Sequence, residues 1–250
     1  MTIGRRFRRA TTAPTPATAL SDLSQLVQES PQASLPRDRG RYLRVVFYFA
    51  RLFLSFIGWN LVLGNIPGLR SYVRATNVRR WHDHAQRFRS LALNLGGVLI
   101  KLGQFLSIRV DVLPPEVTTE LRGLQDEVPA ESMEDIRAVI EGEFGRPVEG
   151  VFAWVAPEPQ AAASLAQVHL AQLKSGEEVV VKVQRPRIEM LVDTDLAALR
   201  LAATWLKFYR PVSRHMDLDR LYDEFARTTR AELDFVAEGR NADRFANDFA

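Results

Sequence analysis

The sequence predicts an α+β fold in which helices predominate and a small antiparallel sheet forms past the middle of the chain. Two observations predict this class. Apolar residues recur at helical spacing on both sides of residues 161–184, and within that range two strand-like segments flank a polar turn that contains glycine. Hydrophobic residues make up 46% of the 250 positions, which is enough for a folded core.

Residues 1–40 read as a flexible basic leader, rich in Thr, Ala, Pro, Ser and Arg and without sustained hydrophobic periodicity. No apolar stretch follows the basic run 5–9, which argues against a secretory signal. The absence of acids from residues 1–20 leaves an organellar transit peptide open. The chain has no cysteine, which excludes disulfides, thiolate metal sites and cysteine nucleophiles.

Charge is distributed unevenly along the chain. Residues 1–90 carry 15 basic and 4 acidic side chains, whereas residues 91–250 carry 18 basic and 26 acidic ones. A basic leader before an acidic globular part predicts contact with an anionic surface, with a membrane as the first candidate and nucleic acid as the second. The alternative is that the two halves partly neutralise each other within the fold.

Residues 41–90 are predicted to form an amphipathic or apolar helical region that contacts a membrane. The uncharged stretch 52–63 covers 12 residues, fewer than the roughly 20 that a spanning helix needs. Arg51 would cost about 2.5 to 3.5 kcal/mol at the centre of a span. An interfacial or core-packed helix is therefore favoured over a membrane span. Its aromatic residues form an apolar face rather than a nucleic-acid-reading motif, so we expect no nucleic-acid partner.

Residues 91–145 are predicted to form a helical extension. Apolar residues recur at helical spacing from Leu91 to Leu106, and Pro114-Pro115 then end one helix and open the next. Ser132, with Asp135 three residues later, resembles a capping box. Gly145 is expected to end that helix.

Residues 146–250 contain the predicted hairpin and further helices. Residues 167–173 alternate in the manner of a strand, residues 174–177 supply a turn with glycine, and residues 179–183 form an apolar second strand. Pro186 is expected to open a long helix, and another helical stretch begins at Leu218.

Lys182 is a basic residue inside this apolar second strand. The chain has 29 arginines but only four lysines, so a lysine at such a position calls for a reason. An ammonium group buried among valines is costly unless it reaches water or meets an anion, and a phosphate or a carboxylate is the anion to expect. A compact ammonium fits between phosphate oxygens where a planar guanidinium would not.

Two further polar groups lie on predicted helices. Lys101 and Gln104 are neighbours at i and i+3, and Gly103 between them lets another part of the chain approach closely. Three carboxylates fall within about two helical turns and can pair with lysine or hold a divalent cation: Glu232, Asp234 and Glu238. Each group taken alone is also compatible with a solvated helix face or a polar notch in helix packing.

In their order along the chain, these motifs resemble the UbiB/AarF/ADCK family of atypical protein-kinase-like proteins. The resemblance covers roughly residues 40–250 and rests on four co-ordered motifs: Lys101-x-Gly103-Gln104, Ala161-Ala162-Ala163-Ser164 with Gln167-Val168-His169, the strand 179–186, and Glu232-x-Asp234 with Glu238. It implies that residues 91–145 form the family's signature extension. Residues 146–250 would then be an incomplete protein-kinase-like N-lobe.

The resemblance implies a nucleotide-contacting role for the hairpin region. In place of the glycine-rich loop of kinases, the loop over the nucleotide phosphates would consist of Ala161, Ala162, Ala163 and Ser164. Lys182 would contact the phosphates and pair with Glu238, the counterpart of the glutamate on helix C of kinases.

The resemblance also implies a regulatory role for the extension. Its signature residues Lys101, Gly103 and Gln104 would fold over the active site and restrict access by protein substrates. They would meet the acidic residues Glu232 and Asp234.

A kinase-like site also needs a catalytic-loop Asp, a nearby Asn and a second Asp that holds magnesium. The run 215–218 mimics the catalytic loop, but Tyr222 stands at the Asn position and Val236 replaces the glycine of D-F-G. No catalytic or metal-binding residue is therefore expected within the chain, and the magnesium ligands are expected downstream of it. His82-x-His84 has no further ligand nearby to complete a metal site.

The implied function is that of the N-terminal portion of an atypical kinase or ATPase, which binds ATP or ADP with magnesium and supports isoprenoid-quinone or related lipid metabolism. The expected partners are adenine nucleotide and either an anionic membrane surface or lipid-pathway proteins. The expected location is cytoplasmic and peripherally membrane-associated, with mitochondria or plastids as the alternative. The alternative function is a non-catalytic, truncated pseudokinase module that binds a membrane or a partner protein.

Overall fold

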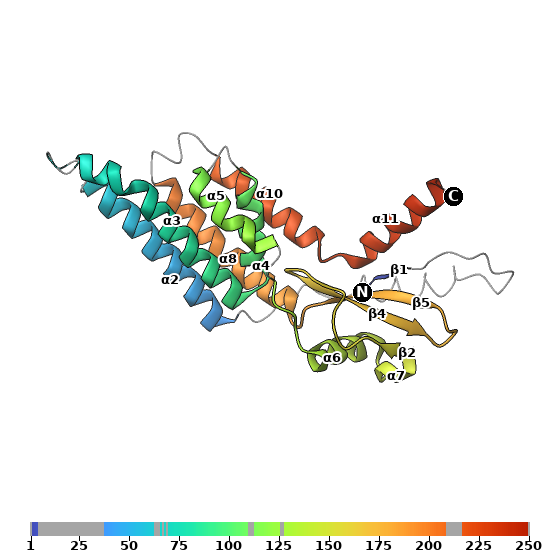
Figure 1. Cartoon of the computed structure of the whole chain (residues 1–250). Coiled ribbons are helices and arrows are strands. Elements are labelled where there is room, and N and C mark those ends of the chain that lie inside the picture. Colours follow the sequence, from blue (N-terminus) through green and yellow to red (C-terminus); the bar gives the residue numbers. More distant parts are fainter. Residues whose placement is uncertain are drawn as a thin grey trace.

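The computed structural model consists of a helical bundle joined to a small sheet (Figure 1). It describes residues 2–4, 38–62, 66, 68, 70–109, 113–125, 128–208 and 217–249. The bundle contains α2 (Arg39–Phe56), α3 (Arg70–Leu95), α4 (Val98–Ser107), α5 (Pro115–Arg122), α8 (Ile188–Lys207) and α10 (Leu218–Ala231). Two short helices extend α2 and α5: η1 (Ile57–Val62) and η3 (Gly123–Gln125). The predicted helix-dominated α+β class is confirmed.

The sheet is antiparallel, with strand order β1-β5-β4-β2 and with β3 paired to β4. Its strands are β1 (Thr2–Gly4), β2 (Phe152–Val155), β3 (Ala161–Ala162), β4 (Ala166–Leu173) and β5 (Glu178–Gln184). The β4–β5 pair is the predicted hairpin, and Gly176 adopts the positive φ of 87° that its turn requires.

Part of the predicted flexible leader belongs to this sheet. Thr2–Gly4 pairs with β5, opposite residues 180–182. An edge strand presents unpaired N–H and C=O groups, which a short extended segment can satisfy. Residues 38–40 form the start of α2, with Asp38 as its N-cap, and residues 1 and 5–37 of the leader lie outside the described residues.

The two faces of β5 differ. Val179, Val181 and Val183 are buried against α6 (Met133–Phe144), where Ile136 and Ile140 are fully buried. Figure 1 shows α6 and α7 (Val148–Val151) on this side of the sheet and α11 (Phe235–Asp248) on the other. Because successive side chains of a strand point to opposite faces, Lys182 faces α11.

The caps of α5 and α6 form as predicted. Pro115 is the first residue of α5. Ser132 Oγ accepts the Asp135 N–H at 3.1 Å at the start of α6, and Gly145 ends α6 in the left-handed conformation.

Two predicted helical stretches are interrupted. The stretch that begins at Leu91 breaks at Gly96-Gly97, where both φ angles are positive, so that α3 ends and α4 begins there. The stretch from Leu218 breaks at residues 232–234, because the Asp234 side chain caps a new helix, α11.

A buried ion pair joins α2 to α8. Arg41 Nε and Nη2 donate to the two carboxylate oxygens of Asp195 at 2.7 and 2.6 Å. The same guanidinium donates to the carbonyls of Leu95 and Gly96 at the end of α3, at 2.6 and 3.0 Å. Arg41 therefore connects three helices of the bundle.

The outer side of α2 is apolar. The segment Arg39–Trp59 is long and apolar enough to cross a membrane by length and composition alone, and 6% of an 18-residue apolar window within it is buried. Core helices of soluble proteins can meet the same criteria of length and composition. In this fold, Val45 and Tyr48 of α2 pack into the core of the bundle.

Candidate nucleotide site

Lys182 and Glu238 form a two-point ion pair between β5 and α11. Lys182 Nζ lies 2.8 Å from Oε1 and 2.6 Å from Oε2 of Glu238. The lysine side chain is 29% exposed and the glutamate 50%, so water reaches both groups. The contact expected between these residues is present, and it is open to a ligand.

The ring of Phe235 lies next to the lysine of this ion pair. The ring is buried, and Lys182 Nζ lies 4.5 Å from the ring centroid, within the range of a cation–π contact. Gln184, two residues further along β5, donates through its side-chain amide to the Leu233 carbonyl at 2.8 Å. Strand β5 is thus tied to the turn from which α11 starts.

Asp234 has a different role from the one the resemblance implied. Its carboxylate accepts the Ala237 N–H at 2.8 Å, and its carbonyl accepts the Glu238 N–H at 3.1 Å. It is the N-cap of α11, and among the described residues its side chain makes no hydrogen bond or ion pair with the extension. By fixing the first turn of α11, Asp234 positions Glu238 opposite Lys182.

The loop Ala161–Ser164 is joined to the lysine strand through β4. Ala161 pairs with Val168 of β4, and Val168 pairs with Lys182 of β5, so the three residues form one row across the sheet. The Ala163 N–H donates to the Ala166 carbonyl at 2.8 Å, and Ser164 is buried. The predicted loop and the predicted lysine are therefore held in one sheet by three adjacent strands, β3, β4 and β5.

Arg185 anchors this loop, and no role was predicted for it. Its Nε donates to the Ala163 carbonyl at 3.0 Å and its Nη2 to the Pro129 carbonyl at 2.5 Å, while Nη1 contacts the Glu131 carboxylate. The guanidinium thus joins the loop to the segment before α6. A sequence signal was available, because an arginine that directly follows a buried strand needs partners for its five donors.

A directed chain of hydrogen bonds runs under the loop through two buried side chains. The Glu131 N–H donates to Gln167 Oε1, and the Gln167 amide nitrogen lies 3.2 Å from His169 Nε2. His169 Nδ1 lies 2.8 Å from the Ala156 carbonyl, which can only accept. His169 is therefore the neutral tautomer with its proton on Nδ1. These residues of the Gln167-Val168-His169 motif serve the structure of the site.

The signature residues of the extension divide into two groups. Lys101 Nζ contacts the Glu232 carboxylate at the end of α10, as the resemblance implied. Gln104 instead donates to the Leu124 carbonyl at 3.0 Å, and Gly103 packs against the Leu124 side chain. Lys101 reaches the acidic cluster, whereas Gly103 and Gln104 hold α4 against η3.

We expect Gly103→Ala to lower the free energy of unfolding by about 1 to 2 kcal/mol. A Cβ at this position would lie 2.2 Å from Cδ1 of Leu124, which is fully buried and has little room to move. Overpacking of this kind costs about 1 to 3 kcal/mol, and the higher helix propensity of alanine returns up to about 1 kcal/mol.

Urea unfolding followed by circular dichroism measures this loss. Gly142→Ala is the matched control, because a Cβ at that helical glycine meets no atom within 4 Å. The control should gain up to about 1 kcal/mol. A comparable gain for Gly103→Ala would show that the close packing against Leu124 is unimportant.

Asp217 and Leu218, the described residues of the run 215–218, do not form a catalytic loop. The Asp217 carboxylate accepts the N–H groups of Asp219 and Arg220, both at 3.1 Å, and caps α10. Residues 209–216 lie outside the described ranges. Within those ranges, no group of three or more His, Asp and Glu side chains is placed to hold a metal ion.

Comparison with known protein families identifies the chain. The family model of the ABC1 atypical kinase-like domain matches residues 123–250, about half of the sequence. The chain belongs to this family. The ABC1 match includes the loop Ala161–Ser164, Lys182 and Glu238, and it begins after the signature residues at 101–104.

Individual relatives of the ABC1 family agree with this assignment. ACTIVITY OF BC1 COMPLEX KINASE 7, chloroplastic, from Arabidopsis thaliana is 43% identical over 170 residues, which are 68% of this chain and 24% of that protein. Probable protein kinase UbiB from Azotobacter vinelandii is 41% identical over 171 residues, 68% of this chain and 32% of the relative. The chain thus spans about a quarter to a third of the curated relatives it matches.

Among solved structures, the chain is similar to Rv3197 in its complex with erythromycin from Mycobacterium tuberculosis. The two share 27% sequence identity with a TM-score of 0.37. The match covers 67% of this chain and 42% of the other.

Proposed function

We propose that this chain supplies the phosphate-contacting half of an ATP- or ADP-binding site in an atypical kinase or ATPase. The Lys182–Glu238 ion pair, in the same sheet as the loop Ala161–Ser164 and one strand away from it, is the observation that carries the proposal. In kinases, a strand lysine held by a helix glutamate contacts the nucleotide phosphates. Membership of the ABC1 family supports the same assignment.

The residues present fit the phosphates of a nucleotide better than they fit magnesium. The Lys182 ammonium has three donors and remains partly open to solvent, so it can bind phosphate oxygen while it contacts Glu238. Magnesium favours carboxylate oxygens and substrate phosphates in octahedral geometry. When bound, it would neutralise the phosphate charge. We place its protein ligands downstream of this chain, in agreement with the missing D-F-G motif.

A nucleotide titration of the purified 250-residue chain tests the proposal. Binding of a fluorescent ADP analogue should be measurable and should be displaced by ATP, because the lysine, its glutamate and the loop are in place. ATP hydrolysis should be weak or undetectable with or without magnesium, because the chain lacks the catalytic-loop and D-F-G residues. A chain that binds no nucleotide would favour the non-catalytic pseudokinase module. Robust magnesium-dependent turnover would overturn the view that the catalytic residues lie elsewhere.

We further propose that the protein supports isoprenoid-quinone or related lipid metabolism and associates peripherally with a membrane. The lipid role follows from the resemblance of the motifs to the UbiB/AarF/ADCK family, and the likeness to probable protein kinase UbiB supports that resemblance. The exposed apolar side of α2 supports contact with an anionic membrane surface, with lipid-pathway proteins as other partners. We place the protein in the cytoplasm, or alternatively in mitochondria or plastids. One relative is a chloroplastic protein by name.

A further inference from the structure

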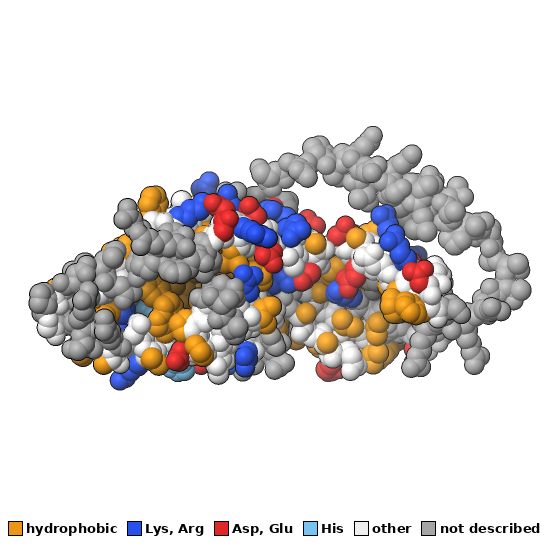
Figure 2. All heavy atoms as spheres, turned by 90° about the horizontal axis from the view of Figure 1, so that it is seen from above, with side chains coloured by type: hydrophobic (Ala, Val, Ile, Leu, Met, Phe, Trp, Pro, Cys, Tyr) orange, Lys and Arg blue, Asp and Glu red, His pale blue; other side chains and the backbone are white. Residues whose placement is uncertain are grey.

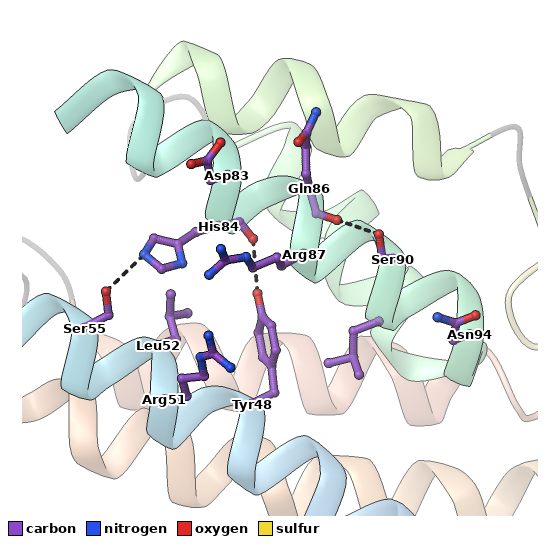
Figure 3. Close-up of a pocket in the computed structure, with 11 residues that line it drawn as sticks. Tyr48, Arg51, Leu52, Ser55, Asp83, His84, Gln86, Arg87, Ser90 and Asn94 are labelled. Carbon is purple, nitrogen blue, oxygen red and sulfur yellow. Dashed lines mark hydrogen bonds between the residues drawn. The ribbon is translucent and has the colours of Figure 1, made fainter. Parts of the chain in front are cut away.

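A groove of about 910 Å³ lies between α2 and α3, in the bundle and away from the nucleotide site (Figure 3). Its size falls within the range of small-molecule sites in proteins. Among the described residues, three hydrogen-bonding contacts join the two helices here: Tyr48 Oη donates to the His84 carbonyl at 3.1 Å, Ser55 Oγ lies 3.3 Å from His84 Nε2, and Arg80 Nη2 donates to Ser55 Oγ at 3.3 Å. Burial raises the pKa of the Tyr48 phenol, so this donor keeps its proton throughout the ordinary pH range. These contacts, together with the ring contacts Tyr48–Phe88 and Phe56–Trp81, hold the two helices at the width of the groove.

Two arginines face this groove from opposite helices. Figure 3 shows the guanidinium groups of Arg51 and Arg87 in the space between α2 and α3, one from each helix and both on the same side of the Tyr48 side chain. Neither arginine makes a hydrogen bond or an ion pair with any of the residues that the structure describes. Two like charges that face one gap repel each other, and an anion between them removes that repulsion.

The surroundings of the groove are electropositive. The pKa of His84 is lowered first by burial and then by the positive charges of Arg80, Arg87 and Arg51, while Asp83 opposes the shift. Asp83 is the one carboxylate among the residues that line the groove. Two guanidinium groups therefore outweigh a single acid, and the balance favours an anionic ligand.

An exposed apolar stripe runs along α2 next to the groove. Leu43, Phe47 and Leu54 are 62, 69 and 65% exposed. At spacings of four and seven residues they share one side of the helix. Around the helix axis, Arg51 lies between this stripe and Tyr48, which is on the side of α2 that faces the groove. A ligand that has both an anionic group and a long apolar part matches this pattern.

We propose that the α2–α3 groove binds the headgroup of an anionic phospholipid, with the phosphate between Arg51 and Arg87 and the acyl chains along the stripe Leu43, Phe47 and Leu54. A soluble phosphate would leave the stripe exposed, whereas a lipid in a membrane covers it and gains apolar burial. The inference rests on the proposed membrane contact and gives it a defined site. It is independent of nucleotide binding.

Exposed arginines elsewhere on the bundle provide a control. Arg220 and Arg227 are exposed on α10 and do not line the groove. Figure 2 shows acidic and basic side chains mixed over one face of the molecule. On α10 itself, Asp219 and Asp223 form ion pairs with Arg200. Removal of two arginines there changes the net charge by the same amount as removal of the groove pair.

The experiment is flotation of the 250-residue chain with vesicles of phosphatidylcholine alone or mixed with phosphatidylglycerol. The wild-type chain should prefer the mixed vesicles. Each arginine near an anionic surface contributes on the order of 1 kcal/mol, so Arg51→Gln with Arg87→Gln should weaken this binding about 10- to 30-fold. Arg220→Gln with Arg227→Gln should change it by less than about 3-fold, because distant charges are screened by salt. Both variants should unfold at the wild-type temperature and bind nucleotide as the wild type does.

Other results of the flotation experiment would contradict separate parts of the proposal. Equal losses for the two double variants would overturn the groove and leave a diffuse electrostatic membrane contact. A wild-type chain that binds neither vesicle would refute the membrane contact itself. Binding of soluble glycerol 3-phosphate is measured separately. The lipid assignment fails if this compound binds the wild-type chain as tightly as the mixed vesicles do and the groove variant loses that binding. The site would then take a free phosphate. Phe47→Ser should weaken binding to the mixed vesicles, and a variant that binds unchanged would remove the stripe from the proposal.

Discussion

Lys182→Met is expected to weaken binding of ADP or ATP to this chain by about 10- to 100-fold. The ammonium is the charged donor proposed to meet the phosphates, and hydrogen bonds to charged groups contribute about 1.5 to 3 kcal/mol. At about 1.4 kcal/mol per tenfold change, this gives the stated loss. Methionine keeps most of the length and apolar stem of lysine, so packing on Phe235 is largely preserved. Titration with a fluorescent nucleotide measures the change.

Lys174→Met is the matched control for this experiment. Lys174 lies in the turn of the same hairpin and is exposed, so its loss should leave nucleotide binding within about 2-fold of wild type. The free energy of unfolding of the Lys182 variant should lie within about 1 kcal/mol of the wild-type value, because partly exposed ion pairs contribute little to stability. If both lysine variants bind nucleotide like the wild-type chain, Lys182 does not contact the phosphates.

The hairpin and its lysine were predictable because their signals are local. Alternation over 167–173, a glycine turn and a valine-rich strand specify β4 and β5 without reference to the rest of the chain. The cap at Ser132 and the end of α6 at Gly145 are local in the same sense. The Lys182–Glu238 contact spans 56 residues, and it was expected only because the order of the motifs resembled a known family.

One prediction failed where a local signal was given too little weight, and one predicted site residue has a structural role that its local signal indicated. The Gly96-Gly97 pair interrupts an apolar pattern that otherwise continues at helical spacing, and glycine pairs are strong breakers. Asp234 was grouped with two other carboxylates by its charge alone. An aspartate at the start of an apolar helical stretch is also a preferred N-cap, and in the structure this second role prevails.

The α2–α3 groove and the anchor at Arg185 had no such signal. The groove depends on the separation of two helices, and contacts such as the hydrogen bond between Tyr48 and His84, across 36 residues, hold that separation. Arg185 reaches back 56 residues to the Pro129 carbonyl. Contacts of this kind follow from tertiary packing, and periodicity or composition does not specify them.

Asp195 shows the same limit in the core of the bundle. On α8 it lies among the buried residues Val192, Leu196 and Leu199, so the sequence indicates that this carboxylate is buried and needs a partner. The partner, Arg41, lies 154 residues away. Nothing in the pattern of α8 distinguishes Arg41 from the other arginines of the chain.

We expect Arg41→Met to lower the free energy of unfolding by about 3 to 5 kcal/mol, the cost of leaving one member of a buried ion pair without its partner. The side chains are 6 and 0% exposed, and the variant would also leave the Leu95 and Gly96 carbonyls without their donor. Urea unfolding measures the change. Arg200→Met, which removes the exposed pair with Asp223, is the control and should cost less than about 1 kcal/mol.

The loss should depend on pH in a direction that identifies its cause. Burial raises the pKa of the Asp195 carboxyl, and the hydrogen bonds from Arg41 oppose this shift, so in Arg41→Met only the rise remains. A carboxyl with a raised native pKa stabilises the fold below its unfolded value, near 3.8, and loses that stabilisation as the pH rises. The variant should therefore lie closest to wild type at acidic pH and furthest from it near neutrality. Arg41→Met with Asp195→Leu should recover much of the loss at neutral pH, because an apolar pair needs no counter-charge. A deficit that is equal at all pH values, or that the second substitution leaves unchanged, would place the cost in lost packing rather than in an unpaired buried charge.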